Sequence, residues 1–138
     1  MAFNILIVDD SAIIRKMVER TIRISSVPVA EMYQAANGKE GLEIIGKNWI
    51  DIVLADINMP VMDGMTMLET MHEDEMMRHI PVVIVSTEGS ETKIERLWQK
   101  GMKAFVKKPF MPETIREVMR EVLGEWDETD SNASTDSF

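Results

Sequence analysis

The chain has 138 residues, a net charge of −9 and no cysteine, which fits one domain built around one hydrophobic core. The lack of cysteine excludes disulfides, thiolate metal sites and cysteine nucleophiles. The negative charge argues against direct binding to nucleic acid. No apolar run approaches the roughly 20 residues that cross a membrane, and residues 1–4 lack the basic start of a signal peptide. We therefore expect a cytoplasmic protein without membrane contact.

Five apolar runs alternate with five helix-like segments along the chain. The strongest runs are continuously apolar and rich in β-branched residues, which is typical of parallel strands covered by helices on both faces. We expect strands at 3–8, 29–35, 50–55, 81–85 and 103–106. We expect helices after the capping residue Ser11, around 42–48, from 64 to about 71, over 91–100 and from Pro112. The pattern predicts an α/β fold, a single doubly wound (βα)5 domain.

The last 14 residues differ in composition from the rest. Residues 125–138 contain five acids and no base, and are otherwise rich in Ser and Thr. Such a segment lacks the apolar residues that a packed core requires. We therefore expect a domain over 1–124 and a disordered acidic tail over 125–138, with an interaction tail as the alternative.

Polar side chains stand at the carboxyl ends of four predicted strands. Taken singly, each has an ordinary explanation, because Asp often caps a helix and Lys near a strand end is usually solvated. The carboxyl ends of parallel strands, however, meet at one edge, where open α/β sheets bind their ligands. The sequence therefore predicts one crevice that collects the carboxylates of Asp9, Asp10 and Asp56, the hydroxyls of Ser86 and Thr87, and an ammonium from the Lys107–Lys108 pair.

The charges in this crevice indicate its chemistry. Two carboxylates 4 Å apart repel by roughly 4 kcal/mol at an effective dielectric constant near 20, so three of them need a cation or must take up protons. Oxygen ligands without sulfur or imidazole favour a hard metal, Mg²⁺ first and Mn²⁺ as the alternative. One carboxylate can then attack phosphorus and form an aspartyl phosphate.

Four motifs in order along the chain resemble the receiver domains of two-component response regulators, nearest to the stand-alone, CheY-like members. They are residues 8–11 (VDDS), 56–64 (DINMPVMDG), 85–88 (VSTE) and 108–110 (KPF). The resemblance covers residues 3 to about 123. It implies a flavodoxin-like sheet with strand order 2-1-3-4-5.

The resemblance also implies roles for the carboxylates. Asp56 is the phosphoacceptor. Asp10 and Asp56 bind the metal directly, together with the backbone carbonyl of Asn58, and Asp9 acts mainly through metal-bound water. Asn58 and Glu88 flank the site at positions that tune loss of the phosphoryl group, and their combination implies a short-lived phosphoryl group.

Further roles concern the response to phosphorylation. Lys108 pairs with Asp56 or its phosphate, and the Lys108–Pro109 bond is expected to be cis. Ser86 moves to hydrogen-bond the phosphoryl group, with Thr87 as the alternative hydroxyl. Phe105 occupies the switch position, often Tyr, so its switching must rest on packing.

A stripe of apolar residues marks the fourth predicted helix. From pattern alone it is simply core. The resemblance instead implies that part of it faces outward, on a partner surface formed by Ile94, Trp98, Met102, Phe105 and Lys107.

Taken together, these inferences predict a response regulator phosphorylated by a sensor histidine kinase, CheA-like if the pathway is chemotaxis, and acting on an unidentified protein target. A phosphorelay intermediate is the alternative. An independent enzyme of the haloacid-dehalogenase type is disfavoured, because it needs an Asp where Asn58 stands, and a silent binding protein is disfavoured by the intact site. We expect a monomer, with dimerisation on phosphorylation as the alternative.

Overall fold

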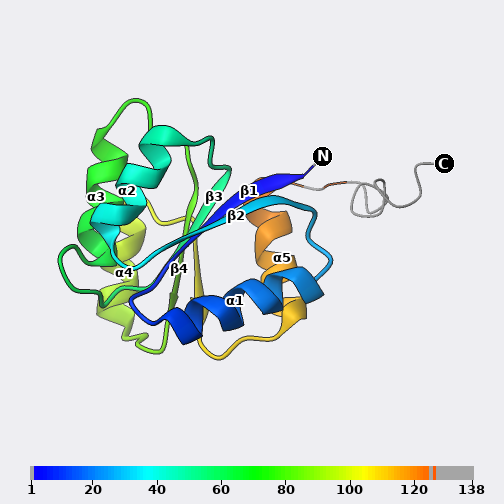
Figure 1. Ribbon diagram of the computed structural model, residues 1–138. Coiled ribbons are helices and arrows are strands. Elements are labelled where there is room, and N and C mark those ends of the chain that lie inside the picture. Colours follow the sequence, from blue (N-terminus) through cyan, green and yellow to red (C-terminus); the bar gives the residue numbers. More distant parts are fainter. Residues whose placement is uncertain (1, 125, 127–138) are drawn as a thin grey trace.

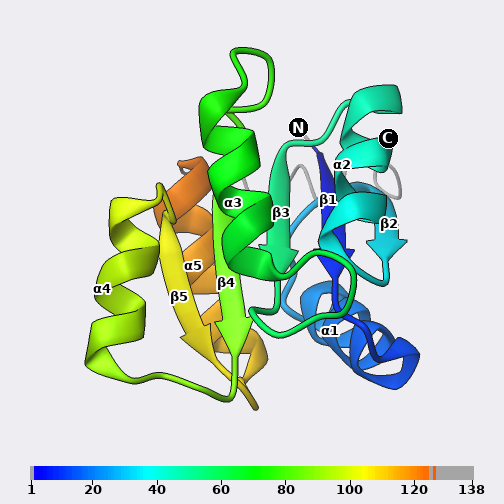
Figure 2. The ribbon, with the colours of Figure 1, turned by 90° about the vertical axis from the view of Figure 1, so that its left-hand side faces the viewer.

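The computed structural model describes residues 2–124 and 126. Five parallel strands form one sheet in the order β2-β1-β3-β4-β5, which confirms the predicted fold and strand order. All strands point toward the same edge of the sheet (Figure 2). The strands are β1 (Phe3–Val8), β2 (Val29–Ala35), β3 (Ile52–Ala55), β4 (Val82–Ser86) and β5 (Ala104–Lys107).

Five helices connect and follow the strands. Four of them begin at a side-chain cap that accepts a backbone N–H bond, and the fifth begins at a proline. The predicted cap Ser11 is confirmed, since it accepts from the amide of Ile14. The helices are α1 (Ala12–Ile24), α2 (Gly38–Lys47), α3 (Gly64–Glu73), α4 (Glu91–Gln99) and α5 (Pro112–Leu123).

The helices cover both faces of the sheet (Figure 1). Helices α1 and α5 lie on one face, and α2, α3 and α4 lie on the other. Alternate strand residues serve the two cores because successive side chains point to opposite faces. In β1, Ile5 and Ile7 join the α1/α5 core, whereas Leu6 and Val8 join the other core. The sheet is thus buried on both faces, and its carboxyl edge is left to hold polar groups.

The core extends past the last helix. Trp126 is buried, and its ring meets Phe3 edge to face with centroids 5.9 Å apart. The guanidinium of Arg120 lies 5.1 Å from the centre of the same ring. Trp126 was assigned to the tail from composition, and its packing corrects that assignment. The prediction of disorder for 127–138 lies outside the described residues. Among the residues described, no helix has the length and apolarity that crossing a bilayer demands.

Candidate phosphoryl and metal site

Three carboxylates come together at the carboxyl edge of the sheet. Asp9 and Asp10 follow β1, and Asp56 follows β3. One oxygen from each lies within 4.8 Å of the others. Asp9 is buried, Asp56 is half-buried and Asp10 is exposed, so the group opens toward solvent on the side of Asp10.

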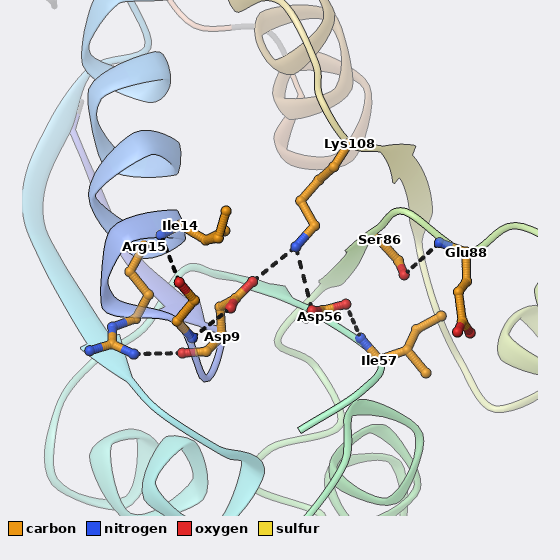
Figure 3. A network of polar contacts seen from close by, with 9 residues as sticks. Asp9, Ile14, Arg15, Asp56, Ile57, Ser86, Glu88 and Lys108 are labelled. Atoms are coloured by element: carbon orange, nitrogen blue, oxygen red, sulfur yellow. Dashed lines mark hydrogen bonds and ion pairs between the residues drawn. The ribbon is translucent and has the colours of Figure 1, made fainter. Parts of the chain in front are cut away.

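The ammonium of Lys108 joins two of these carboxylates. Its Nζ lies 3.0 Å from Oδ2 of Asp9 and 3.4 Å from Oδ2 of Asp56 (Figure 3). The Lys108 side chain is only 14% exposed, so these contacts are weakly screened by solvent. The Lys108–Pro109 bond is cis, as the resemblance implied. Three segments that are distant in sequence therefore supply the predicted charges to one place.

The backbone of the phosphoacceptor candidate Asp56 is fixed on both sides. Its amide donates to the carbonyl of Val8 on the neighbouring strand, at 3.0 Å. Helix α3 begins directly against it, because the amide of Gly64 donates to the carbonyl of Ile57. A Cβ at position 64 would overlap the carbonyl oxygen of Asp56. This close approach explains why the motif carries glycine there.

Asp9 is held through all of its acceptor atoms. Its Oδ1 accepts from the amide of Ser11 at 2.9 Å, and its Oδ2 pairs with Lys108. Its backbone carbonyl accepts from Nη1 of Arg15 at 2.6 Å (Figure 3). The sequence analysis missed Arg15. An available signal was a cation in the first turn of a helix, where the macrodipole disfavours positive charge.

Ser86 and Thr87 differ in environment. Ser86 is the last residue of β4 and is buried, and its Oγ accepts from the amide of Glu88 at 3.1 Å. Thr87 is exposed and lines a separate apolar groove. Figure 3 places the Ser86 hydroxyl near Asp56. The structure thus places the Ser86 hydroxyl at the carboxylate site and Thr87 beside it.

The two predicted tuning residues contact one another. The Lys93 ammonium lies 2.9 Å from Oε2 of Glu88. Lys93, together with a hydrogen bond from the Asn58 side chain, holds the pKa of Glu88 below its ordinary value of 4.5. Through Asn58, Glu88 links the β4–α4 loop to the loop that follows Asp56.

The donor set fits a hard divalent cation. The formal charges of Asp9, Asp10, Asp56 and Lys108 sum to −2, which one such ion neutralises. Carboxylate oxygens are the ligands that Mg²⁺ prefers. Asp10 is exposed, so one side of the site is open to solvent. Mg²⁺ that is bound to proteins usually keeps several waters and also binds phosphate oxygens of the substrate, and both kinds of ligand could enter from this side.

The predicted partner surface is only partly exposed. Trp98 is 50% exposed and Lys107 is exposed, while Ile94 and Phe105 are half-buried near Gly89. The prediction for Met102 is wrong, because its side chain is 2% exposed and lies in the core beneath α4. Gly101, at a φ of 107°, ends α4 and turns the chain inward, so that the Met102 amide bonds to the carbonyl of Leu97.

Comparisons with known proteins agree with this geometry. The model of the response regulator receiver domain family matches residues 5–120. The Vibrio cholerae chemotaxis protein CheY-3 is 30% identical over 120 residues, covering 87% of this chain and 91% of that protein.

Solved structures give the same result for the fold. The V. cholerae chemotaxis protein CheY4 superposes with a TM-score of 0.80 at 32% identity, covering 89% of this chain and all of that one. The receiver domain of the Pseudomonas aeruginosa sensor histidine kinase PA1611, whose structure has a magnesium ion in its active site cleft, gives 0.79 at 21% identity. That match covers 91% of this chain and all of the other.

Proposed function

Because the chain belongs to the response regulator receiver family, we propose that Asp56 accepts a phosphoryl group from a histidine kinase. The new charge then switches a protein-binding surface. The observation that carries this proposal is the convergence of Asp9, Asp10, Asp56 and Lys108 from separate strand ends. The chain acts as a signalling switch and catalyses only its own phosphorylation and dephosphorylation.

The proposed transfer is a displacement at phosphorus. A carboxylate oxygen of Asp56 attacks the phosphorus of a phosphohistidine, the new O–P bond forms, and the P–N bond breaks with its electron pair left on the imidazole. Lys108 moves from Asp9 to a phosphoryl oxygen, which places its charge where negative charge accumulates. The 3.4 Å separation between Lys108 and Asp56 supports this, since a small side-chain movement suffices.

Asp9, Asp10 and Asp56 would hold the divalent cation, with the carbonyl of Asn58 as a further ligand. Bound there, Mg²⁺ neutralises phosphoryl oxygens and aligns them with the nucleophile. The formal charge of −2 on the three carboxylates and Lys108 supports a cation requirement, as does the magnesium reported for the P. aeruginosa receiver domain.

The phosphodonor reaches Asp56 from the carboxyl edge. An apolar groove of about 250 Å³ opens there between α1 and the β5–α5 loop, and Lys108 forms part of its wall. Met17 and Phe110 line the groove, and Ile13 and Met111 are exposed nearby on α1 and the β5–α5 loop. Exposed apolar side chains beside a reactive group suit the docking of a histidine-bearing helical protein.

The proposed output runs from Ser86 to α4. The buried Ser86 hydroxyl turns to the phosphoryl group, and Phe105 turns inward by packing alone. Trp98, half exposed on α4, lies on the surface that the target reads. The similarity to Vibrio chemotaxis proteins supports a role in chemotaxis-type signalling.

Acetyl phosphate tests the central claim without the cognate kinase. With Mg²⁺ present, intact-mass spectrometry should show the gain of one phosphoryl group, and Asp56→Asn should show none. Asp63→Asn, which alters an exposed carboxylate at the start of α3, is the matched control and should still gain the group. An equal gain in Asp56→Asn, or no gain in the unaltered chain with Mg²⁺, would refute the proposal.

A further inference from the structure

We propose that Arg15 is a positioning residue that holds the β1–α1 loop in the shape required for binding a divalent cation. This inference rests on the proposed function, since it concerns the same metal site. Arg15 is not a ligand. It acts through the backbone of Asp9, to which its guanidinium is hydrogen-bonded (Figure 3).

The contacts of Arg15 join three elements. Nη1 donates to the carbonyl of Asp9 at 2.6 Å, and Nε donates to Oε1 of Gln34 on β2 at 3.1 Å. The Gln34 amide in turn donates to Glu19 on α1 at 2.8 Å, and Glu19 also pairs with Arg23 at 3.1 Å. A planar guanidinium fixed at two nitrogens has little freedom. Hydrogen bonds through Arg15 therefore link the Asp9 carbonyl to α1 and β2.

The location of Arg15 has a cost that its contacts explain. It lies in the first turn of α1, where the macrodipole disfavours a cation. It is also half-buried. A hydrogen bond between a charged donor and a backbone carbonyl is stronger than a neutral one and offsets this cost. This placement indicates that Arg15 acts on the β1–α1 loop and is not simply a solvent-exposed side chain of α1.

The hydrogen bond from Arg15 to the Asp9 carbonyl matters most when Lys108 moves away from Asp9. In the structure, the acceptor atoms of Asp9 have three polar partners, namely the Ser11 amide on Oδ1, Lys108 on Oδ2 and Arg15 on the carbonyl, and its amide donates to the carbonyl of Ala35 at 3.0 Å. Under the proposed transfer, Lys108 moves to the phosphoryl group. The bonds to Ser11, Arg15 and the Ala35 carbonyl then remain, and of these only the Arg15 bond holds the Asp9 carbonyl, which leads into the peptide of Asp10.

Positioning and charge predict opposite effects, which makes the role testable. A guanidinium close to three carboxylates repels a cation, so if charge were the whole effect, its removal would tighten Mg²⁺ binding. If Arg15 positions the loop, its removal weakens binding, because residues that orient metal ligands typically contribute a factor of about 10–100 to metal affinity.

The experiment is titration of the full chain with Mg²⁺ by isothermal calorimetry. We expect Arg15→Met to raise the Kd about tenfold. Lys16→Met, which removes the same charge from the neighbouring exposed position on α1, should leave the Kd unchanged or slightly lower. Arg15→Lys keeps the charge but not the two-sided hydrogen bonding, and should give an intermediate Kd. An unchanged or lower Kd in Arg15→Met overturns the inference.

A second readout does not depend on the metal. In metal-free protein, amide hydrogen exchange at Asp10 and Ser11 should accelerate in Arg15→Met and stay unaltered in Lys16→Met. If Arg15→Met does not fold, Arg15→Lys tests the inference instead, by its Kd for Mg²⁺ and by amide exchange at Asp10 and Ser11. Failure of the unaltered chain to bind Mg²⁺ refutes the proposed function and this inference together. Normal binding by both the unaltered chain and Arg15→Met refutes the inference alone.

Discussion

At the scale of single residues, the carboxylates around the site differ in their charged partners and in their exposure to solvent. Asp9 and Asp56 share a largely buried ammonium, whereas Glu88 is exposed and depends on Lys93 and Asn58. Lys93 is the largest influence on Glu88, through a hydrogen bond and through its charge, and it lowers the pKa of that carboxyl. A residue of α4 therefore lowers the pKa of the Glu88 carboxyl.

We expect Lys93→Met to raise the pKa of Glu88 toward 4.5, with the Asn58 hydrogen bond keeping part of the lowering. Carbon-detected NMR titration of the Glu88 carboxyl measures this. Lys100→Met, which removes the ammonium paired with Glu69, is the control and should leave the Glu88 pKa unaltered. A Glu88 pKa that is the same in Lys93→Met and the unaltered chain would contradict the assignment.

The sign of the pH dependence follows from the lowered pKa. The Glu88–Lys93 pair contributes its full stability above the unfolded-state pKa of about 4.5. The contribution is lost as pH falls through the lower pKa of the folded state. Because Glu88 is exposed, solvent screening keeps this contribution small.

At the scale of elements, α4 carries neighbouring residues with opposite environments. Leu97 is fully buried against the sheet, and Trp98 is half exposed on the surface proposed for the target. Leu97→Ala should lower the free energy of unfolding by about 2–5 kcal/mol through lost burial and the cavity left behind. Trp98→Ala should change it by less than about 1 kcal/mol and weaken target binding.

Urea denaturation followed by circular dichroism compares the two variants on one helix. Near-equal losses in both would show that Trp98 is part of the core and would remove it from the partner surface. Met102→Ala adds a check on the corrected assignment, since a residue that is 2% exposed should behave like Leu97.

The elements themselves were predictable because local rules and the fold agree. Apolar runs located all five strands, and Ser11 and Pro112 located the starts of two helices. The third strand begins two residues later than predicted, at Ile52, because the side chain and backbone of Asp51 bond to Asn4 as a separate link. A strand boundary differs from the predicted one where a polar side chain takes the place of a backbone partner in the hydrogen bonds between strands.

The site was predictable to the extent that topology places strand ends together. Asp9 and Asp56 needed only the parallel sheet, whereas the choice of Lys108 over Lys107 came from the family resemblance. Arg15 and Met102 depended on three-dimensional detail, namely a side chain that reaches back past its own helix start and a chain reversal at Gly101. No periodicity in the sequence encodes either contact.

At the scale of the whole molecule, we expect the three clustered carboxylates to lower the stability of the fold when no cation is present, because like charges repel. Mg²⁺ that binds only the folded chain should stabilise it by about 2.7 kcal/mol at a hundredfold excess over its Kd. Asp10→Asn should lose most of this gain, yet be no less stable than the unaltered chain without Mg²⁺, because it removes one of three like charges. Urea denaturation with and without Mg²⁺ measures both effects.

Glu43→Gln, an exposed position on α2, is the control for that experiment and should keep the full response to Mg²⁺. An equal response in Asp10→Asn would show that the cation binds elsewhere. A fall in stability of Asp10→Asn without Mg²⁺ would show that Asp10 has a structural role that its exposure does not indicate.

The extent of the folded core supplies the last prediction. Trp126 lies beyond α5, but it packs against Phe3 at the start of β1 and under Arg120, and is 8% exposed. A buried aromatic ring with an edge-to-face partner and a cation over its face stabilises by area burial and by both contacts. Trp126→Ala should therefore lower the free energy of unfolding by about 3 kcal/mol.

Trp49 gives the matched control, because the same substitution at a side chain that is 78% exposed should cost less than about 1 kcal/mol. Both values come from urea denaturation followed by circular dichroism, which does not depend on the tryptophan removed. Equal, small losses would place the end of the folded domain at residue 124, as composition suggested. A large loss of unfolding free energy in Trp126→Ala alone would show that Trp126 and the start of β1 unfold together, as parts of one cooperative unit.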